Sequence, residues 1–188
     1  MLWFIVLVSA PTALIACGML WAVARGMNTI EILGEVPIAS RPIWPRLSII
    51  CPACDEEESV EASLRSVLAT GYPDLEVVAI NDRSRDRTPE IIDVLARDDE
   101  RLRALHIETL PEGWLGKLNA MARGVAMATG DWLLFADADV MYAPTALEKA
   151  ITYAENNQLD YLAALPEIEP ATFAADTVFN VMVPLTML

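Results

Sequence analysis

The chain has 188 residues, which is enough for about one globular domain. It carries 27 Asp and Glu against 13 Lys and Arg, a formal net charge of −14. An excess of negative charge on this scale repels phosphate backbones, so nucleic acid is excluded as a partner.

Residues 1–24 carry no charged side chain and are mostly apolar. Trp3 and Trp21 lie 18 positions apart, roughly 27 Å along a helix, close to the ~30 Å of a bilayer's hydrocarbon core. Tryptophan concentrates at both membrane interfaces. A cleavable signal peptide is the alternative, but a basic leading region is absent and the apolar run is too long. The pattern predicts an uncleaved transmembrane signal anchor.

Residues 25–46 form a connector whose three prolines argue against one continuous helix. No Lys or Arg precedes the predicted anchor, whereas Arg25, Arg41 and Arg46 follow it. The positive-inside rule therefore predicts that the rest of the chain faces the cytoplasm, with the lipid bilayer as a partner.

After the connector, strand-like and helix-like segments alternate. Strands are expected at 47–51, 75–80, 102–107, 132–135 and 161–165, and helices at 57–70, 88–97, 117–129 and 144–156. Strict alternation predicts an α/β domain over residues 47–170, with a mostly parallel sheet and helices on both faces. The apolar stretch 171–188 fits a membrane-surface helix, the start of another transmembrane segment or a core helix equally well.

Carboxylates gather where three predicted strands end, at 51–58, 81–88 and 137–139. Ligands of such sheets bind at these carboxyl ends. Asp137 and Asp139 are two residues apart, so on an extended chain they project to one side and can converge on one cation. Oxygen ligands of this kind suit Mg²⁺ or Mn²⁺, which bridge to the phosphates of a substrate.

Cys51 and Cys54 have the C-x-x-C spacing of zinc and redox sites. No second pair accompanies them, and the single histidine, His106, lies in a separate predicted strand. We interpret the pair as two small, semi-buried side chains.

The three loops read Cys-Pro-Ala-Cys-Asp-Glu-Glu-Glu at 51–58, Asn-Asp-Arg-Ser-Arg-Asp-Arg-Thr at 81–88 and Asp-Ala-Asp at 137–139. Their order and spacing resemble the nucleotide-sugar-binding, N-terminal half of family 2 glycosyltransferases, which have the Rossmann-like GT-A fold. The Gly-Trp-Leu-Gly-Lys segment at 113–117 is similar to one in a membrane-bound subset that includes hopanoid-associated glycosyltransferases. The resemblance covers about residues 46–166.

The resemblance implies a role for each matching residue. Pro52, Cys54 and Glu56 would lie along the base and ribose of the nucleotide. Asp82 would accept a hydrogen bond from the base, the N3–H of uracil.

For the phosphates, the resemblance implies that Lys117 meets the diphosphate near the start of a helix. Asp137 would approach the ribose or the metal, and Asp139 would bind the metal. Structural alternatives remain: Glu56 as a solvated helix start and Lys117 as a surface lysine.

The other charges of the second loop have simpler interpretations. We expect Asp86 to support its own turn. Arg83, Arg85 and Arg87 are interpreted as a solvated charge run.

The chain departs from the family pattern in three places. Asn81 stands where the family often has Asp, and Cys54-Asp55 replaces an aromatic or Arg followed by Asn. The catalytic base of the family, an Asp or Glu on a later segment, has no recognisable counterpart, so we expect it beyond Leu188. Glu167 and Glu169 are acidic but lie in no such motif.

The resemblance therefore implies a membrane-anchored, hexosyltransferase-like enzyme that faces the cytoplasm. It would move a sugar, with inversion, from a nucleotide diphosphate donor, expected to be a UDP-sugar, to a lipid or other membrane-delivered acceptor. We expect no transfer by these 188 residues alone. The alternatives are a nucleotidyltransferase, which would bring a Gly-rich, basic first loop, and an inactive nucleotide-binding fragment.

Overall fold

A computed structural model describes residues 14–19, 21, 25 and 32–164 of the chain. Residues 33–163 form one compact unit, and the segments 1–32 and 164–188 belong to a second unit. Within the second unit, residues 14–19 are helical. No helix among the described residues is long and apolar enough for a bilayer crossing. The predicted anchor over 1–24 falls largely outside these residues, and the segment 171–188 falls entirely outside them.

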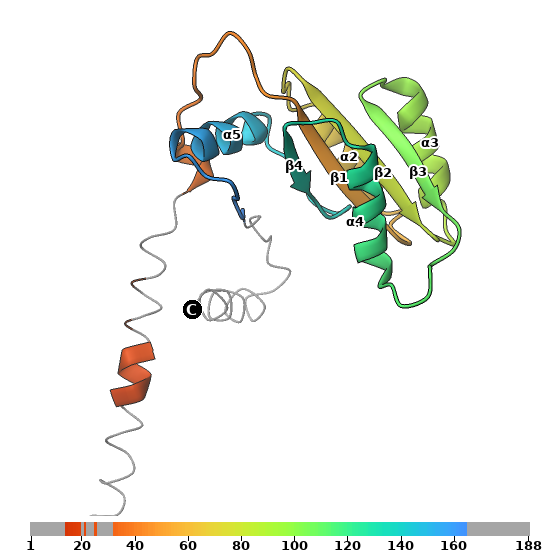
Figure 1. The fold of residues 1–188 in the computed structure, drawn as a ribbon, viewed down its shortest axis with the longest axis horizontal. Coiled ribbons are helices and arrows are strands. Elements are labelled where there is room, and N and C mark those ends of the chain that lie inside the picture. Colours follow the sequence, from red (N-terminus) through yellow and green to blue (C-terminus); the bar gives the residue numbers. More distant parts are fainter. Residues whose placement is uncertain (1–13, 20, 22–24, 26–31, 165–188) are drawn as a thin grey trace, which may run out of the picture. The chain divides into compact units, whose positions relative to one another are not determined.

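Four strands of the larger unit form one parallel sheet (Figure 1). They are β1 (Leu47–Ala53), β2 (Leu75–Asp82), β3 (Leu102–Ile107) and β4 (Trp132–Phe135), in the spatial order β3-β2-β1-β4. All three pairings are parallel, as the alternation of segments predicted.

The predicted fifth strand at 161–165 is wrong for its described part. Residues 161–164 have no strand conformation, and residue 165 lies outside the described residues. A strand is stabilised by pairing, and β4 pairs only with β1 within the described part of the chain. Tyr161 is 79% exposed, so the apolar run that suggested a strand is not buried there.

Helices cover both faces of the sheet, as predicted. On one face, side chains of α2 (Val60–Leu68), α3 (Thr88–Asp98) and α5 (Ala146–Asn156) share a buried cluster with alternate residues of the strands. On the other face, α4 (Gly116–Met127) packs on β1 and β2. The pleat of β1 divides its side chains accordingly, with Ile49 in the first cluster and Ile50 in the second.

A glycine allows α4 to lie close to the sheet. A Cβ atom at Gly124 would lie 2.6 Å from Cγ2 of Ile50 and 2.6 Å from Cδ1 of Ile80. Any larger residue at Gly124 would therefore push the helix away from the strands.

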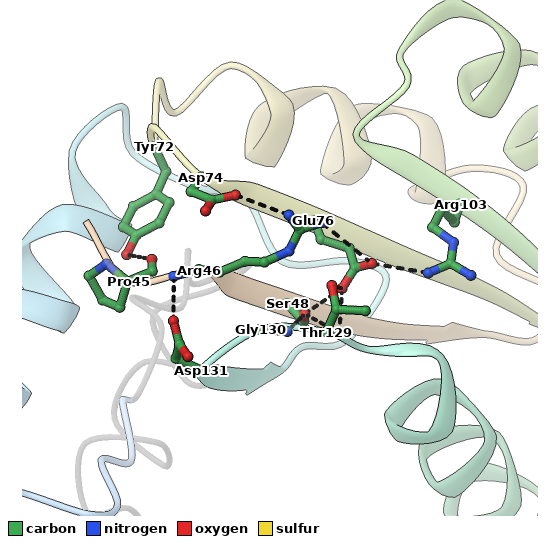
Figure 2. Close-up of polar contacts among 10 residues, drawn as sticks. All are labelled: Pro45, Arg46, Ser48, Tyr72, Asp74, Glu76, Arg103, Thr129, Gly130 and Asp131. Atoms are coloured by element: carbon green, nitrogen blue, oxygen red, sulfur yellow. Dashed lines mark hydrogen bonds and ion pairs between the residues drawn. The ribbon is translucent and has the colours of Figure 1, made fainter. Parts of the chain in front are cut away.

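The described end of the connector packs as part of the larger unit. The rings of Trp44 and Tyr72 meet edge to face, with their centroids 5.5 Å apart. The Tyr72 hydroxyl donates a 2.7 Å hydrogen bond to the carbonyl of Pro45 (Figure 2). Arg41 forms an ion pair with Glu155 on α5. These contacts fix the path by which the chain enters β1.

A buried carboxylate, Glu76, holds the amino ends of the strands together (Figure 2). It accepts hydrogen bonds from the Ser48 hydroxyl at 2.5 Å, the Thr129 backbone N–H at 2.9 Å and the Arg103 guanidinium at 3.1 Å. Burial raises the pKa of Glu76, but these hydrogen bonds outweigh burial and hold the pKa below its ordinary value. The network holds the amino ends of the strands together. The loops lie at the opposite, carboxyl ends of the strands.

Candidate functional site

The two loops that follow β1 and β2 are joined by hydrogen bonds at the carboxyl edge of the sheet. The backbone N–H of Asp55 donates to the Ser84 hydroxyl at 3.0 Å, and that of Glu57 donates to the Asp86 carboxylate at 3.0 Å. In return, the Arg85 N–H donates to the Asp55 carboxylate at 2.6 Å. The side chains of Asp55, Ser84 and Asp86 therefore hold one loop against the other.

Asp86 supports its own turn, as expected, because its carboxylate also accepts a 3.0 Å hydrogen bond from the Thr88 N–H at the start of α3. The Thr88 hydroxyl in turn accepts a 2.8 Å hydrogen bond from the backbone N–H of Glu56. The Glu56 carboxylate accepts one from the Ser59 hydroxyl at 2.8 Å. Glu56 therefore lies in a turn that both loops fix.

Together with the segments before α4 and after β4, the loops surround a cleft of about 390 Å³, which we call the acidic cleft. It is lined by Pro52, Ala53, Cys54, Glu56, Asp82, Arg83, Gly116, Lys117, Asp137, Ala138 and Asp139. The structure thus brings together every residue for which the sequence predicted nucleotide or metal contact.

Asp137 and Asp139 reach the cleft on a turn. β4 ends at Phe135, and residues 138 and 139 form a turn that the Val140 N–H closes with a 3.4 Å hydrogen bond to the Asp137 carbonyl. The extended-chain reason for their convergence is therefore wrong, although both carboxylates line the same cleft.

The two thiols of the cysteine pair lie in different surroundings. Burial, and then the negative charges of Asp137 and Asp139, raise the pKa of Cys51 to about 12. Cys51 is therefore protonated at neutral pH, and a thiol is a poor nucleophile and ligand. Cys54 is exposed, and neither residue is in a disulfide.

Lys117, in the first turn of α4, already pairs with a carboxylate of the cleft. Its Nζ lies 2.5 Å from Oδ1 of Asp137, and the two side chains are 60% and 58% exposed. An ion pair this exposed contributes only about 0–1 kcal/mol. A divalent cation at Asp137, or a phosphate at Lys117, can therefore replace it at little cost.

The residues of the cleft can supply a metal with few ligands. Within the described residues, no group of three or more His, Cys, Asp or Glu side chains is arranged to hold a metal ion. Asp137 and Asp139 provide two carboxylates, too few for a closed structural site. Two carboxylates do fit Mg²⁺ or Mn²⁺, which complete their coordination with substrate phosphates and water.

Sequence analysis missed the role of Arg83. The Asp82 side chain is only 5% exposed, and Arg83 forms an ion pair with it at 2.8 Å. The interpretation as a solvated charge run is therefore wrong for Arg83, whereas the Arg87 side chain is 76% exposed. No sequence signal predicts that adjacent residues will pair in this way, because neighbours usually point apart.

Comparisons with known proteins agree with this geometry. Residues 48–173 match the family described as Glycosyl transferase family 2. The uncharacterised glycosyltransferase EpsJ of Bacillus subtilis is 31% identical over 116 residues, which are 62% of this chain and 32% of EpsJ. A GalNAc(5)-diNAcBac-PP-undecaprenol beta-1,3-glucosyltransferase of Campylobacter jejuni is 28% identical over 95 residues, 50% of this chain and 30% of the relative. This chain spans about one third of the length of such curated relatives.

Solved structures show the same fold. The mannosyltransferase PcManGT from Pyrobaculum calidifontis, in complex with GDP-Man and Mn²⁺, superposes with a TM-score of 0.61 and 25% identity, over 77% of this chain and 42% of PcManGT. S. aureus TarS 1–349 in complex with UDP superposes with a TM-score of 0.52 and 25% identity, over 60% of this chain and 33% of TarS. The likeness supports the predicted GT-A type of α/β fold. The narrower resemblance to hopanoid-associated enzymes stays a prediction. Because the family match spans well over half of its residues, the chain belongs to glycosyl transferase family 2.

Proposed function

We propose that this chain binds the nucleotide diphosphate sugar of a glycosyl transfer reaction in the acidic cleft. The observation that carries the proposal is that loops from three strands and the start of α4 bring all the predicted donor contacts to one cleft. The cleft lies at the carboxyl ends of parallel strands, where ligands of such sheets bind.

The negative charges of the cleft determine that a nucleotide diphosphate sugar needs a cation in order to bind. Asp137 and Asp139 alone would repel a diphosphate, so its binding requires a cation between them. A bound Mg²⁺ or Mn²⁺ would neutralise the charge that develops on the leaving diphosphate. Lys117 adds positive charge at the start of α4, where helix N–H groups also favour phosphate.

We propose a uridine diphosphate sugar as the donor, with its base near Pro52, Cys54 and Asp82. The complex of TarS with UDP supports this choice of nucleotide. PcManGT was solved with GDP-Man, so a guanosine nucleotide is the comparison to include in any test.

A lipid or other membrane-delivered acceptor is proposed, with transfer by inversion on the cytoplasmic side of the membrane. The uncharged run at 1–24, followed by Arg25, supports a membrane location. The Campylobacter relative is named for a substrate carried on undecaprenol, a membrane lipid. Direct displacement requires a general base for the acceptor hydroxyl, and none of the carboxylates that line the cleft has a motif for that role. We therefore propose that these 188 residues bind the donor without transferring its sugar.

Calorimetry on the full chain tests donor binding. UDP should bind in the presence of Mn²⁺ or Mg²⁺, and at least about tenfold more weakly in EDTA, because one well-placed ionic contact is worth about 1.5–3 kcal/mol. Asp139→Asn should weaken the metal-dependent binding by a similar factor. Asp98→Asn makes the same charge change at an exposed position of α3 and should have no effect. Equal affinity with and without metal would show that Asp139 is not a metal ligand. If no nucleotide bound at all, the proposal would be contradicted.

A further inference from the structure

The outward side of α4 is apolar, although it faces solvent. Four residues from its N-cap onward follow one another at spacings of three and four, and therefore lie on one side of the helix: Leu115, Leu118, Ala122 and Val125. All four are exposed, with fractions of 70% for Leu115, 54% for Leu118 and 38% for Val125. Trp114, which immediately precedes them, is 48% exposed. We call these five residues the apolar face of α4.

The side of α4 that packs on the sheet carries none of these large side chains. Its buried residues are Asn119, Ala120 and Gly124, and the helix contacts β1 and β2. A helix on the surface of a globular protein usually directs its large apolar side chains to the core and its polar ones to water. In α4 the large apolar side chains point away from the core. Exposed apolar surface that runs along a helix in this way marks a contact site.

The charges of α4 indicate which kind of partner this face suits. The whole chain has a net charge of −14, and α2, α3 and α5 each contain acidic residues, but α4 contains none. Its two charged residues, Lys117 and Arg123, are both basic. At roughly 100° of rotation per residue they lie on opposite sides of the apolar face. An apolar face with Trp and Leu, flanked by Lys and Arg that reach anionic head groups, is typical of helices that lie in a membrane interface.

The same charges disfavour a second copy of the chain as the partner. Two copies that packed through the apolar face would bring the basic side chains of both helices close together. Because α4 has no acidic residue, the helices themselves could not neutralise this repulsion. The negative surface of a bilayer with anionic lipids would attract the same side chains.

The apolar face begins beside the acidic cleft. Gly116 and Lys117, in the first turn of α4, line that cleft, and Leu115 and Leu118 are their neighbours in the sequence. Neither leucine lines the cleft itself. A bilayer in contact with the apolar face would therefore bring the cleft to the membrane surface without occupying it.

We propose that the apolar face of α4 lies against the anionic surface of a lipid bilayer and presents the acidic cleft to an acceptor carried in that bilayer. This inference deepens the proposed function and rests on its membrane-delivered acceptor. It adds a membrane contact within the larger unit to the anchor predicted at residues 1–24. It also assigns a role to large apolar side chains that neither the core nor the donor contacts use.

Photocrosslinking of the full chain in vesicles tests the contact. The photoreactive amino acid benzoylphenylalanine replaces Val125, and the chain is reconstituted into vesicles of phosphatidylcholine and phosphatidylglycerol. Irradiation should attach lipid at this position. Val94 is the matched control, because it is a valine with a similar exposed fraction, 43%, on α3. The helix α3 packs on the opposite face of the sheet, so the same replacement at Val94 should attach little lipid.

Charge variants test the nature of the contact. With the probe at Val125, Leu118→Glu should abolish lipid attachment, because a carboxylate in the apolar face is repelled by anionic head groups, whereas Leu118→Lys should keep most of it. Arg123→Gln should lower the yield by up to about fivefold, the factor expected for one basic side chain near an anionic surface. Both Leu118 variants should leave the melting temperature and the affinity for UDP unchanged, since Leu118 is exposed and lies outside the lining of the cleft.

Three outcomes would overturn the proposal: equal lipid attachment at Val94 and Val125, attachment of Val125 to a second copy of the chain, or no attachment at Val125. Equal attachment would mean that lipid reaches both faces of the unit by random collision. If UDP bound while Val125 attached no lipid, only the membrane contact would be wrong. If lipid were attached at Val125 but no nucleotide bound, the contact would stand and the proposed donor binding would be wrong.

Discussion

At the scale of single residues, Glu76 is a buried charge that joins several segments of the larger unit. Its carboxylate is 4% exposed and is held by donors from β1, from β3 and from the segment after α4. A buried charge of this kind is tolerated only because its hydrogen bonds compensate for lost hydration.

Glu76→Gln should lower the free energy of unfolding by about 2–3 kcal/mol at pH 7, because an amide N–H₂ would face donors in place of a charged acceptor. The pKa of Glu76 lies below its ordinary value in the folded state. The stabilisation is therefore fully present above about pH 4.3, the ordinary pKa of glutamate, and is lost as pH falls through the folded-state pKa. Urea unfolding of both proteins between pH 7 and pH 3 measures this.

Glu61→Gln is the matched control, because Glu61 is 53% exposed and pairs with Arg65 one helical turn away. Its effect should stay below about 0.5 kcal/mol. A difference between wild type and Glu76→Gln that did not change with pH would show that the charge of Glu76 is not what stabilises the fold.

Residue types predicted which side chains line the candidate site better than they predicted which side chains hold the surrounding structure in place. Asp137, Asp139 and Lys117 stood out because they lie in segments that resemble those of family 2 glycosyltransferases. Arg83 and Glu76 did not stand out, because their importance comes from burial and from partners distant in sequence or unusual in backbone conformation. Neither property can be derived from a local pattern of residues.

At the scale of elements, α4 connects the packing of the sheet with the cleft. Its buried side contacts β1 and β2, and its first turn carries Gly116 and Lys117. The distance between helix and sheet therefore determines where Lys117 lies relative to Asp137.

Gly124→Leu should push α4 away from Ile50 and Ile80 and lower the free energy of unfolding by about 1–3 kcal/mol. The same displacement should weaken nucleotide binding, since it moves Lys117. Ala122→Leu enlarges an exposed position of the same helix and should change stability by less than about 0.5 kcal/mol. Urea unfolding and calorimetry measure the two effects, and equal stability of both variants would show that α4 has room at Gly124.

Strands and helices could be predicted because the apolar periodicity of each is local. All four strands of the sheet and all four α-helices of the larger unit appear near their predicted positions. The strand expected at 161–165 failed in its described part because an apolar run becomes a strand only where a neighbour can pair with it. Sequence periodicity shows where an apolar run lies, but it does not show whether another strand is available to pair with that run.

At the scale of the whole molecule, we propose that residues 1–24 hold the larger unit at a membrane. The uncharged run at 1–24 and the arginines that follow it predict a single anchor with the larger unit in the cytoplasm. In membrane vesicles, a protease added to the cytoplasmic side should cleave after Arg25 and leave the anchor protected.

Leu2→Arg should weaken the preference for placing the larger unit in the cytoplasm, because positive charge would then flank both ends of the apolar run. Shielding of the wild-type chain after Arg25 from the cytoplasmic protease would show that the topology is inverted. Complete release of the chain from the membrane would show that residues 1–24 are not an anchor.

The strand order also has a consequence in time. The inner strand β1 lies between β2, which follows it directly, and β4, which begins 85 residues further along the chain. At a synthesis rate of about 5–20 residues per second, these 85 residues take roughly 4–17 s to produce. Throughout that interval one edge of β1 has no strand to pair with, and the turn that carries Asp137 and Asp139 does not yet exist. The loops after β1 and β2 can join while the ribosome is still working, whereas the acidic cleft is complete only after β4 has been made.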